Sequence, residues 1–104
     1  MKTATTETIA GHEITEVLGV VRGSTVRARN VGRDIFAGLK NLVGGEIEEY
    51  TQLAADSREE AYFRMVKDAE RLGADAVVGV RFTTSMIMQG ASEMLAFGTA
   101  VKLK

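Results

Sequence analysis

The feature that most constrains how this chain can fold is the junction at residues 72–82, where a charged segment of helical character meets an apolar segment of strand character. Gly73 follows the last apolar position of the first segment, and glycine there can take the left-handed conformation that ends a helix. The residues after it predict a strand that is buried on both faces, because they are β-branched or aromatic: Val77, Val78, Val80 and Phe82. Gly79 interrupts this strand and predicts either a β-bulge or another backbone packed close to it.

The segment before the junction predicts one long helix from Glu46 to Leu72, since it contains neither glycine nor proline. One helical stripe recurs along it at spacings of three and four: Ile47, Tyr50, Ala54, Ser57, Ala61, Met65, Ala69 and Leu72. Ser57 followed by Glu60 is a capping-box pattern, so a break at Asp56-Ser57 stays open as the alternative. An unbroken helix would span about 40 Å. That is more than a compact domain of this size needs, so part of the helix should pack on something outside its own core.

Three elements are expected before the long helix. Residues 1–11 predict a short edge strand or an ordered arm that ends in a turn at Gly11. Residues 13–29 predict one or two strands near a sheet edge, interrupted at Gly23-Ser24. Residues 30–43 predict a first helix, because Asn30 is a suitable N-cap and apolar side chains follow it at helical spacing; Gly44-Gly45 then ends this helix.

The last third of the chain predicts a β-hairpin, with strands from Ala76 to Met88 and from Ser92 to Lys102 and a turn around Gln89-Gly90-Ala91. Side chains alternate along a strand, so the returning strand has a face of larger residues and a face of mostly small ones. The two sets are Leu95, Phe97, Thr99 and Val101, and Met94, Ala96, Gly98 and Ala100. We expect a helix on the small face and self-association through the leftover apolar face.

These patterns predict a single α+β domain over residues 1–104: a small antiparallel sheet with a C-terminal hairpin, packed against two helices. The strand starts Val17-Leu18-Gly19-Val20 and Val77-Val78-Gly79-Val80 resemble each other. This similarity is consistent with duplication or with two strands that pack alike.

Composition excludes several classes of site. The chain has no cysteine, which excludes disulfides, thiolate nucleophiles and sulfur-ligated zinc. A net charge of -1 argues against nucleic-acid binding, and no apolar run approaches the roughly 20 residues of a membrane span. No secretion signal is recognisable at the N-terminus, so we expect a cytoplasmic protein.

The long helix concentrates the acidic charge of the chain. Residues 46–75 contain nine acidic and four basic side chains, a net charge of -5. This acidity is either a solvated helix face or a surface that meets a basic run of a neighbouring subunit. The basic run consists of Arg22, Arg27, Arg29 and Arg33.

Two sets of residues are candidate metal ligands. His12, the only histidine, precedes Glu13, but neighbours on a strand point to opposite faces, so an exposed histidine without a special role is the alternative. Met86, Met88 and Met94 flank the hairpin turn and resemble a thioether site for Cu(I), although methionines there also serve as packing or interface residues.

No catalytic constellation is recognisable, so an enzyme is the less favoured class. Arg33-Asp34 is the most site-like polar pair, with a structural ion pair as its alternative. Gly44-Gly45-Glu46 lacks the strand and the Lys-Ser/Thr tail of a phosphate-binding loop, and no cofactor is predicted.

Several runs of the sequence together resemble the YbjQ-like family of uncharacterised bacterial proteins. They are the segment from Arg27 to Glu46, Tyr50-Thr51, Arg64-Met65, the junction from Leu72 to Phe82, and Gly98-Thr99-Ala100-Val101. The resemblance covers nearly the whole chain and implies an α+β subunit that assembles into a homopentameric ring. It also carries the label "putative heavy-metal-binding domain", with which a chain containing one histidine and no cysteine disagrees unless symmetry multiplies His12 or the methionines.

We therefore expect a cytoplasmic homopentamer that acts as an interaction or small-ligand-binding module. Heavy-metal binding and an enzyme with an active site between subunits, using Arg33 and Asp34, are the alternatives. The sequence does not identify the small-molecule ligand.

Overall fold

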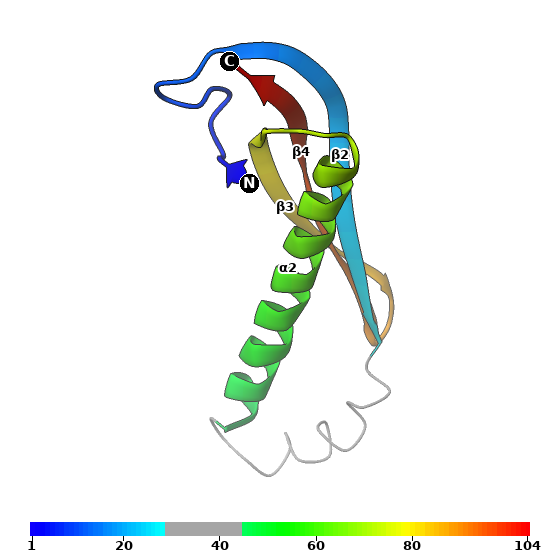
Figure 1. Cartoon of the computed structure of the whole chain (residues 1–104). Helices are drawn as coiled ribbons and strands as arrows, with labels where there is room; N and C mark the ends of the chain where they lie inside the picture. Colours follow the sequence, from blue (N-terminus) through cyan, green and yellow to red (C-terminus); the bar gives the residue numbers. More distant parts are fainter. Residues whose placement is uncertain (29–44) are drawn as a thin grey trace.

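The computed structural model describes residues 1–28 and 45–104, which form a four-stranded mixed sheet with one helix packed across one face (Figure 1). The strands are β1 (Lys2–Thr3), β2 (Ile14–Ala28), β3 (Ala76–Met88) and β4 (Ala91–Leu103), and the helix is α2 (Gly45–Arg71). Their order in the sheet is β1-β3-β4-β2. The predicted α+β class, the C-terminal hairpin and the edge position of residues 13–29 are confirmed.

The prediction of a purely antiparallel sheet is wrong at one edge. β2, β3 and β4 pair in antiparallel fashion, but β1 pairs with β3 in parallel, with Lys2 opposite Ala76 and Thr3 opposite Val77. β1 and β2 lie at opposite edges of the sheet, so the residues between them cross from one edge to the other instead of forming a hairpin. The turn at Gly11 that this crossing contains was predicted, and Gly11 has a φ of 81°.

Helix α2 is continuous over its 27 residues, which confirms the long helix and contradicts a break at Asp56-Ser57. Ser57 is buried in mid-helix, so it does not form a capping box. Its backbone oxygen accepts a hydrogen bond from Thr25 Oγ1 (3.2 Å), and its Oγ accepts one from Arg27 Nε (3.0 Å). A serine that resembles a helix start therefore joins the middle of α2 to β2.

The C-terminal end of α2 lies just before Gly73, as the sequence predicts. Gly73 has a φ of 76°, and its N–H donates to the carbonyl oxygen of Glu70 at 2.9 Å. The N–H of Ala74 donates to the carbonyl oxygen of Ala69 at 3.1 Å. These bonds satisfy carbonyl groups that the helix itself leaves open. The predicted first helix at residues 30–43 lies outside the described residues.

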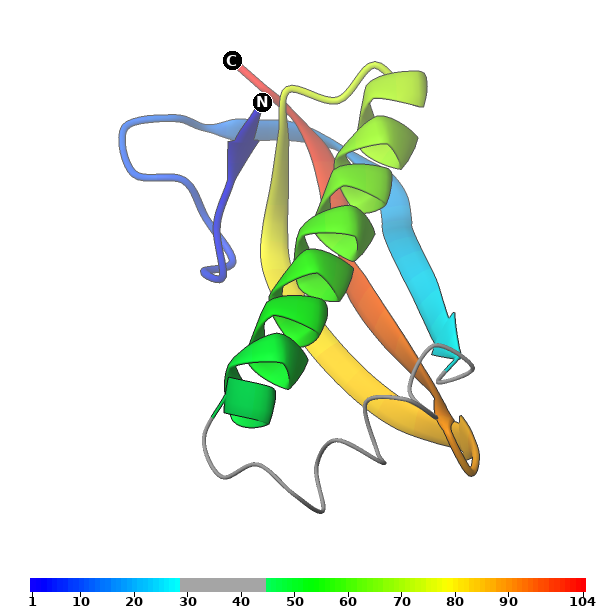
Figure 2. The same ribbon diagram turned by 90° about the horizontal axis from the view of Figure 1, so that it is seen from below.

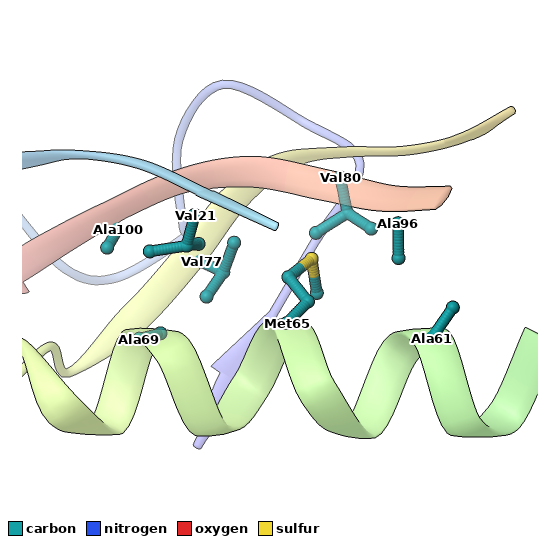
Figure 3. Packing of buried hydrophobic residues seen from close by; sticks show 8 residues of the cluster. All are labelled: Val21, Ala61, Met65, Ala69, Val77, Val80, Ala96 and Ala100. Carbon is teal, nitrogen blue, oxygen red and sulfur yellow. The ribbon is translucent and has the colours of Figure 1, made fainter. Parts of the chain in front are cut away.

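The main core lies between α2 and the sheet (Figure 3). Its fully buried or nearly buried side chains are Ala61, Met65 and Ala69 from α2, and Val21, Val77, Val80, Ala96 and Ala100 from the sheet. Ala96 and Ala100 confirm that a helix covers the small face of the returning strand. A second, smaller cluster on the other face joins Ala76, Val78 and Val101 to partly buried side chains of the N-terminal region and the strand ends.

The predicted interruption at Gly23-Ser24 is wrong, because β2 runs through both residues. Gly23 is instead where α2 approaches the sheet backbone most tightly among the glycines described. A Cβ atom at this position would lie 2.2 Å from the backbone N of Met65 and 2.3 Å from the backbone O of Ala61. The glycine therefore serves helix packing and does not end a strand.

Gly79 and Gly19 are both β-bulge positions. Gly79 has a φ of 63° and Gly19 a φ of 126°, and the pairing register shifts between Val78 and Arg81 and between Val17 and Gly19. No atom lies within 4 Å of a Cβ built on either glycine, so no other backbone packs over the face of the sheet at Gly79. Residues near the N-terminus lie beside Gly79 instead, where the Gly79 N–H donates to the carbonyl oxygen of Thr6 at 2.8 Å. Both bulges face the same part of β4, and β2 curves strongly there (Figure 1). The similarity between the two strand starts thus corresponds to two similar bends.

Burial on both faces holds only for the first part of β3. Val77, Val78 and Val80 are buried, but Phe82 is 46% exposed and the rest of the strand is exposed too. The reason is that α2 packs mainly against β2 and β4, so the tip of the β3–β4 hairpin stands away from the helix (Figure 2). Within the described parts of the chain, no helix is long and apolar enough to cross a membrane.

Candidate functional site

A groove of about 470 Å³ on the helix side of the sheet is the best candidate site. It lies between residues 1–11, which we call the N-terminal arm, helix α2 and strand β3. Its lining is partly polar and partly apolar: Thr3, Ala4, Thr5, Arg58, Glu59, Tyr62, Val80 and Phe82. We call it the helix-side groove.

Backbone pairing and helix periodicity place these side chains. The N–H of Ala4 donates to the carbonyl oxygen of Val77, and the N–H of Val80 donates to the carbonyl oxygen of Ala4, both at 3.0 Å. These bonds hold the arm beside β3. Arg58 and Tyr62 are four residues apart on α2 and so share one side of the helix. Thr3 Oγ1 and Tyr62 Oη form a hydrogen bond of 2.8 Å, which ties the arm directly to the helix.

The helix-side groove has two charged side chains with no hydrogen bond or ion pair to another residue of the described chain: Arg58 and Glu59. Along α2 from Leu53 to Arg71, the other cationic side chains are paired. Their ion pairs are Arg64 with Glu60 (3.0 Å), Lys67 with Glu70 (3.7 Å) and Arg71 with Asp68 (2.9 Å). The groove thus offers one positive and one negative group for a ligand.

A second groove, of about 440 Å³, lies on the opposite face of the sheet. Its lining includes Glu7, Val17, Val78 and Arg81. Arg81 Nη1 already donates to the backbone oxygens of Thr5 (2.9 Å) and Val80 (2.8 Å). Because this cation holds the N-terminal arm, the second groove is the weaker candidate for a ligand site.

The contact between α2 and the free edge of β2 is polar and structural. Arg64 Nη1 donates to the backbone oxygen of Ser24 at 2.7 Å, and Asp68 Oδ2 accepts from the backbone N–H of Arg22 at 3.3 Å. The hydrogen bond from Arg71 lowers the pKa of the Asp68 carboxyl, and the Arg22 N–H acts in the same direction against the opposing effect of burial. The ionised carboxylate thereby occupies backbone groups that an edge strand would otherwise leave open.

Of the predicted basic run, Arg22 and Arg27 contact α2 of their own chain, through Asp68 and Ser57. Arg29 lies outside the described residues. So do Arg33 and Asp34, the predicted polar pair on which an intersubunit active site would depend. The pair therefore stays a prediction.

His12 is exposed in the turn after Gly11, where its backbone N–H donates to the carbonyl oxygen of Ile9 at 3.1 Å. The carboxylate of Glu13 forms a 4.0 Å ion pair with Lys104 Nζ. Among the side chains that the structure describes, no group of three or more His, Asp or Glu is arranged to hold a metal ion. His12 would therefore need ligands from outside this part of the chain.

The three methionines occupy different environments. Met86 and Met88 are 79% and 65% exposed, and the register shift between them interrupts the alternation that would keep both on one face. Met94 packs against the main core, and its sulfur accepts a hydrogen bond from Thr84 Oγ1 at 3.2 Å. Thioether binding of Cu(I) by this set stays a prediction.

Sequence reasoning missed the helix-side groove. Helical spacing alone was enough to place Arg58 beside Tyr62. No comparable signal predicts that Thr3 lies against them, since β1 has only two residues and pairs with a strand about 70 positions away.

Fold and groove define the class: a small α+β subunit with a mixed sheet, one long helix on one face, and a polar-apolar groove at the sheet edge. The chain belongs to the YbjQ family, whose model, described as "Putative heavy-metal-binding", matches residues 1–104.

Similar proteins occur in archaea as well as in bacteria. The UPF0145 protein of Archaeoglobus fulgidus is 65% identical over 100 residues, which cover 96% of this chain and 93% of that protein. The UPF0145 protein of Halorubrum lacusprofundi is 59% identical over all of both chains. The one from Vibrio campbellii is 61% identical and covers 96% of each.

A protein of unknown function from Pediococcus pentosaceus, which belongs to the DUF74 family, has a similar fold in its crystal structure. The TM-score is 0.66 at 19% identity, covering 100% of this chain and 98% of that one. At this level of identity the similarity shows the fold alone.

Proposed function

We propose that this protein is a cytoplasmic, self-associating module, a homopentameric ring, that binds a small ligand in the helix-side groove. The observation that carries the proposal is the apolar surface that strand β2 and the β3–β4 hairpin leave exposed.

This surface consists of large apolar side chains. They gather on two parts of the sheet that α2 does not cover, and each is more than half exposed: Val17, Val20 and Val26 on β2, and Met86, Ile87 and Met88 at the hairpin. Apolar patches of this kind mark interaction surfaces. A second copy of the chain is the partner that we propose.

Size-exclusion chromatography with light scattering tests the assembly. We expect a mass several-fold above 11.2 kDa, and about 56 kDa for five copies. Ile87→Glu should lower the mass, because a carboxylate would be buried without a partner in the interface. Thr8→Glu, a charge placed at an exposed polar position, is the control and should leave the mass unchanged. A wild-type mass of 11.2 kDa at micromolar concentration would contradict self-association.

Heavy-metal binding is the second candidate, favoured by the description of the family model. Several subunits would have to contribute ligands, either His12 imidazoles or the exposed sulfurs of Met86 and Met88. We expect calorimetric titration with Zn(II) or Ni(II) to give heat that His12→Ala removes. With Cu(I), the Met86→Ala, Met88→Ala double variant should lose the heat instead. No heat with any of the three metals at roughly 100 µM would reject this candidate.

A further inference from the structure

We propose that the ligand of the helix-side groove is a small zwitterion with an apolar body, the chemistry of an apolar or aromatic α-amino acid. This inference rests on the proposed small-ligand function and names its ligand class. Three independent features of the groove support it: its two charges, its hydroxyl pair and its apolar wall.

The two charges match a ligand that carries both signs. Arg58 and Glu59 line the same groove, and neither forms a hydrogen bond or ion pair with another side chain that the structure describes. Consecutive residues on a helix point about 100° apart. The guanidinium and the carboxylate therefore meet different groups of a ligand and not one shared atom. A carboxylate matches Arg58, and an ammonium group matches Glu59.

The hydroxyl pair adds a hydrogen-bond donor. Thr3 Oγ1 and Tyr62 Oη are 2.8 Å apart, and either atom can be the donor of the bond that joins them. Each hydroxyl has a single hydrogen. One hydrogen is used in the bond, so the other is available to an acceptor in the groove. A carboxylate oxygen of the ligand is such an acceptor, and Arg58 lies on the same side of α2 as Tyr62.

The apolar wall accounts for the body of the ligand. Val80 forms a buried part of the wall, while Phe82 leaves 46% of its surface exposed. An aromatic or branched aliphatic group placed against Phe82 would remove apolar surface from water, and two aromatic rings would also gain from edge or offset stacking. The volume of about 470 Å³ lies within the usual range for small-molecule sites.

Titration of the isotope-labelled full chain with L-phenylalanine, followed by NMR, tests the proposal. Two analogues serve as comparisons: 3-phenylpropionate lacks the ammonium group, and phenethylamine lacks the carboxylate. We expect saturable shifts at Thr3, Arg58 and Phe82 with phenylalanine, and at least roughly tenfold weaker binding of each analogue. No saturable shift with phenylalanine, or equal binding of either analogue, would overturn the proposal.

Variants then assign each charge. Arg58→Gln should weaken phenylalanine binding at least roughly fivefold and leave phenethylamine binding unchanged, whereas Glu59→Gln should weaken phenylalanine and leave 3-phenylpropionate unchanged. Lys67→Gln, on α2 but outside the groove, is the matched control and should bind phenylalanine like the wild type. Equal effects of all three variants would overturn the assignment. Light scattering on the same samples separates the two proposals, because an oligomer that does not bind phenylalanine rejects only the ligand class.

Discussion

Replacing Gly23 with alanine is expected to lower the free energy of unfolding by about 3 kcal/mol or more. The added methyl group would lie 2.2 Å from the backbone N of Met65 and 2.3 Å from the backbone O of Ala61. Backbone atoms in the middle of a helix cannot turn aside as a side chain can, so α2 has to move away from the sheet. Urea denaturation followed by circular dichroism at fixed protein concentration should show a midpoint about 2 M lower.

Ser24→Ala is the control for this experiment. Ser24 is the next residue of β2, and its contact with α2 uses the backbone carbonyl that accepts from Arg64, which alanine keeps. We expect a change within about 0.5 kcal/mol. If Gly23→Ala were as stable as Ser24→Ala, the close approach of α2 to β2 would be wrong.

Replacing Met65 with alanine is expected to cost about 3 kcal/mol of stability, within the usual range for large-to-small changes in a core. Met65 is fully buried, and Figure 3 shows its sulfur between α2 and the sheet, close to Val77 and Val80. Removal of this side chain leaves a cavity at the centre of the main core, since α2 and the strands are held apart by the residues on either side. The same denaturation measurement checks this value.

Lys67→Ala removes a side chain of similar length from the exposed face of the same helix, outside the proposed interface, and it is therefore the matched control for Met65→Ala. We expect a change within about 0.5 kcal/mol. Comparison at one protein concentration is essential, because self-association adds to apparent stability. Equal losses in the two variants would contradict the placement of the core.

The sequence was sufficient to predict the elements with local signals. Gly73 marked the end of α2, the absence of glycine and proline marked the length of the helix, and Gln89-Gly90-Ala91 marked the hairpin turn. In each case the determining interactions lie within a few residues of each other. The buried helical stripe of Ala61, Met65 and Ala69 was predictable for the same reason.

Features that depend on distant segments were predicted less well. Gly23 has the local signature of a strand break, and only the position of α2 shows that it is a packing contact. Ser57 resembles a helix cap because its partners Thr25 and Arg27, which lie about 30 residues away, are not apparent from its neighbours. The partial exposure of Phe82 likewise depends on the direction in which α2 crosses the sheet. The candidate groove was missed because it combines three such distant segments.

The parallel pairing of β1 with β3 also bears on the order in which the elements of one subunit fold. Lys2 lies opposite Ala76, so the contact closes a loop that contains all of β2 and α2. Closing so long a loop costs chain entropy that only a strand already fixed in the sheet can offset. We expect the N-terminal arm to dock among the last elements when the subunit folds. The helix-side groove, one wall of which is that arm, would then be complete only when the rest of the subunit is in place.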